Sequence, residues 1–166
     1  DLVCTFFSYM CAVALDAKRI INEVLVKKIH TREEMGEQLR QKVSSSLRYG
    51  RPLHLRMANT ALDWQPYCGH LGSTGSSAAD VADTADPVTS WPLPAELFLA
   101  ASWQQQEVWS KVLGVGDMEG SCINMDSHFV FMTTDFDLAG VQKHFPTKVP
   151  YFEHMAVIEI DPSSWN

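Results

Sequence analysis

Residues 127–160 read SHFVFMTTDFDLAGVQKHFPTKVPYFEHMAVIEI, and this stretch decides the fold that the sequence predicts. It contains two apolar runs of strand length, residues 128–132 and 156–160, which are rich in the aromatic and β-branched residues typical of buried strands. A short helical segment, residues 138–144, and a proline elbow at 146–150 separate the two runs. A strand, a polar turn, a helix and a second strand form the repeating unit of a parallel α/β sheet. We therefore predict an α/β fold in which helices pack on a small, mainly parallel sheet.

A helix followed by a strand is predicted upstream, over residues 32–49 and 53–58. Thr31-Arg32-Glu33-Glu34 is a capping box, in which Thr31 and Glu34 each bind a free amide at the helix start. Gly50 and Pro52 end the helix. Apolar and polar residues alternate over 53–58, which is typical of a strand.

Four other segments complete the predicted domain, which spans residues 1–166 as a single α/β unit or as a fragment of a longer chain. Apolar residues over 2–29 recur at helical spacing, and the part at 2–15 is too short for a membrane span, so we expect a core helix. A third helix is expected over 94–113, and a short strand over 122–125. Residues 72–92 are acidic and rich in Gly, Ser, Ala and Pro, which indicates a flexible surface insertion.

The charge and the cysteines limit the class of protein. The net charge is -7 and the basic residues are not clustered, so we expect no nucleic-acid partner, and no membrane partner is expected either. The four cysteines form no CxxC pair. A reduced, cytoplasmic setting with buried thiols is the simplest interpretation.

Polar residues at the ends of the two central strands are the candidate site. Asp135 and Asp137 follow the second of these strands and suit a general base or a metal ligand, although Asp137 is also well placed to cap the next helix. Thr133, Thr134 and Asn59 are candidates for sensing a nucleotide phosphate, but threonines at a strand end often bind their own backbone.

Tryptophans, histidines and cysteines supply weaker candidates. The partner-binding candidates are Trp91, Trp103 and Trp109, whose grouping is typical of either a core or a docking face. Cys68-Gly69-His70 is the tightest pairing of metal-ligand types, but a zinc site needs a second pair, so no metal site is predicted. A nucleophilic Cys68 or Cys122 activated by a distant histidine is an arrangement that only a structure can test.

Two motifs resemble parts of the AAA+ ATPase module, in its divergent form in the dynein heavy chain. Leu47-Arg48-Tyr49-Gly50-Arg51-Pro52-Leu53 is similar to the junction between a helix and the strand that carries the acidic residues in that family. Gly116-Asp117 together with the DSHFVFMTT of residues 126–134 is similar to its sensor strand. The resemblance covers about half of the chain and implies a three-layer fold of the P-loop type.

The chain departs from this family where nucleotide chemistry is done. No Gly-Lys pair occurs, so the phosphate loop is missing, and the strand at 53–58 ends in Asn59-Thr60 rather than in paired acids. The resemblance therefore implies a non-catalytic part of a larger motor or assembly, bound to other protein subunits, in the cytoplasm and at the cytoskeleton or the axoneme of a cilium. ATP and Mg²⁺ would bind only if a phosphate site is supplied elsewhere. Two alternatives stay open: a small hydrolase with an Asp/His site at the strand ends, and an interaction module that docks through its first helix and its tryptophans.

Overall fold

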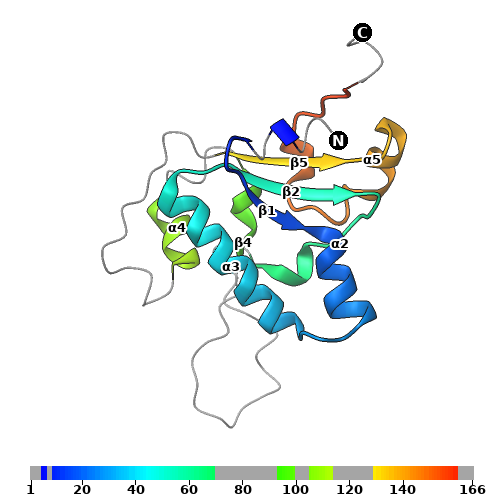
Figure 1. Ribbon diagram of the computed structural model, residues 1–166. Helices are drawn as coiled ribbons and strands as arrows, with labels where there is room; N and C mark the ends of the chain where they lie inside the picture. Colours follow the sequence, from blue (N-terminus) through cyan, green and yellow to red (C-terminus); the bar gives the residue numbers. More distant parts are fainter. Residues whose placement is uncertain (1–4, 7–8, 70–92, 100–104, 114–128, 161–166) are drawn as a thin grey trace.

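The structure is a computed structural model that describes residues 5–6, 9–69, 93–99, 105–113 and 129–160 (Figure 1). The expected insertion at 72–92 and the expected strand at 122–125 lie outside these residues.

A parallel sheet of three strands organises the described residues, in the order β1 (Val13–Asp16), β2 (Leu53–Ala58) and β5 (Val130–Thr134). Both strand pairs are parallel, and Leu55 in β2 lies opposite Leu15 on one side and Met132 on the other. Parallel strands joined through helices are the arrangement that the strand–helix–strand pattern predicts. The α/β class with a small parallel sheet is therefore confirmed.

The expected single helix over residues 2–29 is wrong, because β1 interrupts it. Asp16 ends β1 and caps α2 (Ala17–Ile20) by accepting a hydrogen bond from the Arg19 amide at 3.0 Å. A single turn of π-helix, η1 (Ile21–Val26), continues α2. A short apolar run looks the same in a buried helix and in a buried strand, and here pairing with β2 selected the strand.

The helix over 32–49 and the strand over 53–58 are confirmed as α3 (Arg32–Tyr49) and β2. Both halves of the capping box form, at 3.2 Å for the Thr31 side chain and 3.0 Å for the Glu34 side chain. Gly50 has a φ of 61°, the left-handed conformation that favours glycine. One face of α3 is buried in the core through the predicted stripe Met35, Leu39, Val43 and Leu47.

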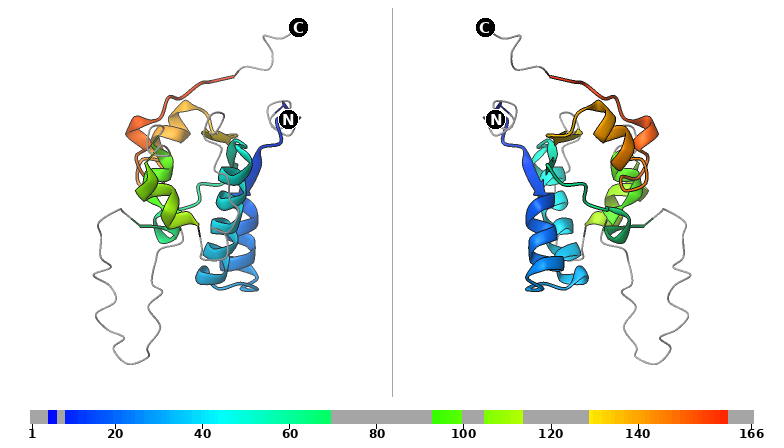
Figure 2. Two further views of the ribbon diagram at one scale, coloured as in Figure 1. Left: turned by 90° about the vertical axis from the view of Figure 1, so that its left-hand side faces the viewer. Right: turned by 90° about the vertical axis from the view of Figure 1, so that its right-hand side faces the viewer.

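The expected helix over 94–113 is wrong as a single element. Its start forms β4 (Leu93–Pro94) and a 3-10 turn, η3 (Ala95–Phe98), and a separate helix, α4, covers Gln106–Val112. β4 pairs with β3 (Cys68–Gly69), which follows the 3-10 turn η2 (Gln65–Tyr67). Leu93, Leu97 and Phe98 are buried, and this burial holds the chain in β4 and η3 rather than in one continuous helix. Figure 2 shows α2 and α3 side by side, with α4 in a second group next to them.

The last part of the chain forms a helix but no final strand. β5 begins two residues later than the predicted start at residue 128, and α5 (Leu138–His144) has the predicted bounds. A 3-10 turn, η6 (Phe152–His154), follows. The expected strand over 156–160 is wrong: these residues have no regular secondary structure, and Ile158 is 81% exposed. A strand needs a neighbour that accepts and donates its backbone hydrogen bonds, and no described strand lies beside this segment.

Candidate functional site

The carboxyl ends of the three parallel strands meet at one edge of the sheet, where ligands of such folds usually bind. The strand register aligns Asp16, Arg56 and Thr133 in one row across β1, β2 and β5. The turns that carry Asn59 and Asp135 follow directly, and the Asp135 amide donates to the Ala58 carbonyl at 2.9 Å. The candidate residues at the two strand ends are thus brought together.

Thr134 is used by the turn itself. Its hydroxyl donates to the Ala58 carbonyl at 3.0 Å and accepts from the Phe136 amide at 3.2 Å. Ala58 has a φ of 49°, and the Thr134 bond ties this left-handed residue to β5. A hydroxyl with both a donor and an acceptor partner in the protein has little capacity left for a phosphate.

Asp137 caps α5, as its position predicts. Its Oδ1 accepts from the Gly140 amide at 2.8 Å. Gly140 allows this close approach, since a Cβ there would lie 2.9 Å from the same oxygen. The carboxylate is therefore part of the helix start.

Thr133 binds a histidine that the candidate site had not included. His54 Nε2 lies 2.7 Å from Thr133 Oγ1, and the imidazole stacks on Phe131 with a centroid distance of 4.5 Å. Burial, together with the nearby Arg56 charge, lowers the pKa of His54 to about 4, so the ring is neutral near pH 7. The alternation over 53–58 marks His54 as polar and solvent-facing, but the middle strand of a parallel sheet is buried on both faces.

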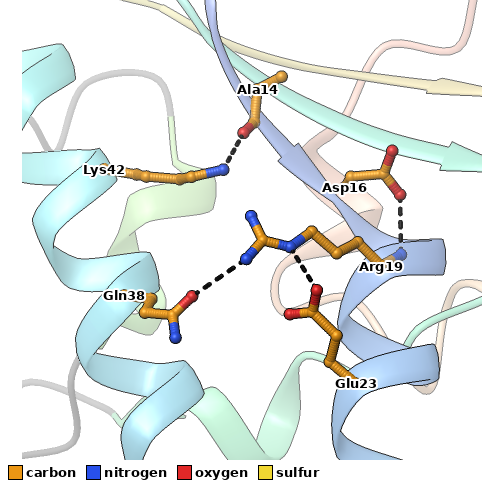
Figure 3. A network of polar contacts seen from close by, with 6 residues as sticks. All are labelled: Ala14, Asp16, Arg19, Glu23, Gln38 and Lys42. Carbon is orange, nitrogen blue, oxygen red and sulfur yellow. Dashed lines mark hydrogen bonds and ion pairs between the residues drawn. The ribbon is translucent and has the colours of Figure 1, made fainter. Parts of the chain in front are cut away.

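A second polar cluster, between α2 and α3, also lay outside the predicted site (Figure 3). Arg19 pairs with Glu23 at 2.9 Å and reaches Gln38 on α3 at 3.4 Å. The hydrogen bond from Arg19 lowers the pKa of Glu23. Lys42 donates to the Ala14 carbonyl at 2.9 Å, and burial lowers its pKa. These side chains join α2, α3 and β1, so the cluster is structural.

Three side chains at the sheet edge are exposed: Arg56, Asn59 and Asp135. No side-chain hydrogen bond or ion pair of theirs is found among the described residues. One cation, one amide and one carboxylate do not form a metal site, and no group of three or more metal-ligating side chains occurs in the described part of the chain.

The structure describes only one of the cysteine candidates and one of the tryptophan candidates, Cys68 and Trp109. Burial raises the pKa of the Cys68 thiol to about 12, so it stays protonated and does not suit a nucleophile. Trp109 is only partly exposed and packs against the core, which argues against a docking role. His70, Trp91, Trp103 and Cys122 lie outside the described residues.

Asp137 and Asp135 form a matched pair for a stability test, because the first carboxylate caps a helix and the second is exposed. We expect Asp137→Ala to lower the free energy of unfolding by about 1 kcal/mol, because it removes a helix cap. Asp135→Ala should change it by less than about 0.5 kcal/mol, as for other exposed sites. Urea denaturation of both variants measures the difference, and equal losses would show that Asp135 also supports the fold.

Comparisons with protein-family models, with curated proteins and with solved structures gave no match to this chain. Among the described residues, no helix has the length and apolar character needed to cross a membrane.

Proposed function

We propose that this chain is a non-catalytic module of the AAA+ type, similar to those of the dynein heavy chain, that acts as a structural or regulatory part of a larger assembly. The observation that carries the proposal is that polar side chains at the strand ends form hydrogen bonds with other groups of the protein. Thr134 binds the backbone of β2, Asp137 caps α5, and Thr133 binds His54. Three of the candidate groups for sensing or activating a nucleotide therefore stabilise the fold, while Asn59 and Asp135 stay exposed.

The connection between β1 and α2 supports the same conclusion. A phosphate loop inserts a glycine-rich turn between a strand and a helix, so that its backbone amides surround the phosphate. Here α2 begins at Ala17 directly after β1, and the Asp16 carboxylate accepts from the Arg19 amide. A carboxylate already occupies the helix start and would repel an anion there.

The arrangement of the strands fits the resemblance on which the proposal is based. In the AAA+ module, the strand that carries the acidic residues precedes the sensor strand, and the sequence matches these to residues 53–58 and 128–132. The corresponding strands β2 and β5 are direct neighbours and parallel. A three-layer arrangement of the whole module, and partners among the other subunits of a cytoskeletal or axonemal assembly, are parts of this proposal.

Nucleotide titration tests the proposal. We expect isothermal calorimetry of the purified chain to detect no binding of ATP or ADP, with or without Mg²⁺, because no phosphate loop is present and the strand-end hydroxyls are already bonded. A Mg²⁺-dependent Kd in the micromolar range, about 8 kcal/mol of binding free energy, would overturn it. In that case Asn59→Ala and Asp135→Ala would identify the site, since both side chains are exposed at the sheet edge.

The alternative of a small hydrolase has less support. Its Asp/His site would need a histidine that takes up and releases protons near neutral pH. His54 lies near the start of β2, its side chain reaches Thr133, and it is buried and neutral. Asp137 is engaged as a helix cap.

A further inference from the structure

The two outer edges of the sheet differ in how they are protected. At the β1 edge the Val13 amide donates to the Pro52 carbonyl at 2.8 Å, so the backbone groups of Val13 face β2. Successive residues of a strand direct their backbone groups to opposite sides, so the residue after Val13 directs its N–H and C=O away from β2. That next residue is Ala14, and the Lys42 ammonium binds its carbonyl at 2.9 Å. Lys42 belongs to α3, and its ammonium occupies a backbone acceptor that a strand from another chain would need at this edge.

Within the part of the chain that the structure describes, the β5 edge has no such protection. The Leu53 amide donates to the Phe129 carbonyl at 2.9 Å, so Phe129, Phe131 and Thr133 face β2. Val130 and Met132 therefore direct their N–H and C=O groups away from the sheet. No lysine, proline or strand covers these groups within the described residues. Phe129, at the start of this edge, is 42% exposed.

Residues 156–160, AVIEI, are a strand-forming segment that pairs with none of the described strands. Valine and isoleucine are among the strongest strand formers, yet Val157, Ile158 and Ile160 are 49%, 81% and 45% exposed. Figures 1 and 2 show this segment leaving the body of the protein, and in Figure 1 it rises on the side of β5 that is opposite β2. In this conformation it does not pair with the β5 of its own chain.

We propose that two copies of this chain associate by exchanging these segments, so that residues 156–160 of each copy add as a fourth strand to the β5 edge of the other. One chain holds both an open edge and an unpaired strand, so a twofold arrangement satisfies both at once, in two equivalent contacts. The added strand would pair with the groups of Val130 and Met132 and would cover the exposed Phe129. The inference rests on the hydrogen-bonding geometry of the sheet, and it is independent of the proposed function.

The mass of the purified chain in solution is the first test. We expect sedimentation equilibrium to show a mass that rises with concentration from 18.6 kDa toward twice that value. Ile158→Asp should keep the chain monomeric, because it places a charge in the new strand contact. Val26→Asp is the matched control, since Val26 is 69% exposed at the end of η1, and it should leave the association unchanged. A wild-type chain that stays at 18.6 kDa at all concentrations overturns the proposal, including the case in which the segment folds back on its own β5.

Mixing two defective chains tests the exchange itself. Val130→Pro removes an outward amide that β2 does not use, at the first residue of the strand, where proline is tolerated. We expect this variant and Ile158→Asp to be monomeric alone and to form a heterodimer when mixed, because one intact edge then meets one intact segment. If Val130→Pro fails to fold, amide exchange decides: the Val130 and Met132 amides should exchange slowly in the wild type and rapidly in Ile158→Asp. A dimer that persists in Ile158→Asp overturns the proposal.

Discussion

Replacing Trp64 with alanine is expected to lower the free energy of unfolding by about 3–5 kcal/mol, the largest loss from any single change considered. The Trp64 side chain is fully buried, and its ring packs edge-on against Tyr67 and Phe98 at centroid distances of 6.5 and 6.1 Å. Its amide donates to the Lys148 carbonyl at 2.9 Å. Trp64 thus joins the loop after β2, the η3 turn and the segment after α5, which lie far apart in the sequence. For a chain of this size the loss corresponds to a fall in Tm of about 10 °C.

Two other variants identify the cause of that loss. Trp109→Ala removes a side chain of the same size from a partly exposed position, and we expect it to cost about 1–2 kcal/mol. Trp64→Phe keeps an aromatic ring and removes the indole N–H, which is buried without a hydrogen-bond partner among the described residues. It should therefore be much milder than Trp64→Ala. Thermal unfolding followed by calorimetry compares the three variants, and equal losses in Trp64→Ala and Trp109→Ala would refute the central role of Trp64.

The two helices that the sequence predicted correctly have local signals at their ends. α3 has a capping box at its start and Gly50 at its end, and both act within a few residues along the chain. The bounds of α5 are marked in the same way by the Asp137 cap. Local hydrogen bonds of this kind do not depend on distant parts of the fold, so the pattern of neighbouring residues is sufficient to predict them.

The elements that the sequence predicted wrongly depend on distant partners. β1 is a strand because Leu53 and Leu55 lie beside it, and nothing within residues 13–16 indicates this. Residues 156–160 have the composition of a strand, but no strand among the described residues pairs with them. In both cases the apolar residues indicate a segment that is stabilised by burial. Whether it forms a helix, a strand or an extended segment depends on the presence of a neighbouring strand.

The candidate site was predicted in part for the same reason. Placing Asn59, Thr133 and Asp135 at one edge required only that the two strands be parallel and adjacent, which the βαβ pattern predicts. The role of His54 required the strand register, because it is the pairing of β2 with β5 that brings His54 to Phe131 and Thr133. An alternating strand pattern cannot show that its polar face is also buried.

His54 makes the stability of the protein depend on pH in a defined window. In the folded protein burial lowers its pKa to about 4, whereas in the unfolded chain the pKa is near 6.5. Between these two values the unfolded state binds more protons, so the free energy of unfolding falls as the pH falls. We expect a loss of about 2 kcal/mol between pH 6.5 and pH 4 from this residue, after allowance for partial solvent screening. Urea denaturation at half-unit steps of pH measures this loss.

The variant His54→Gln separates this effect from the titration of other groups. Glutamine can still hydrogen-bond with Thr133 Oγ1, but it has no proton to gain in this window. The carboxylates and the other five histidines titrate alike in both proteins, so the difference between the two pH profiles belongs to His54. We expect the free energy of unfolding of the wild type to fall progressively relative to that of His54→Gln below pH 6.5. Parallel profiles would show that the imidazole becomes charged in the folded state at an ordinary pKa, and therefore that water or an acidic group reaches it on this face of the sheet.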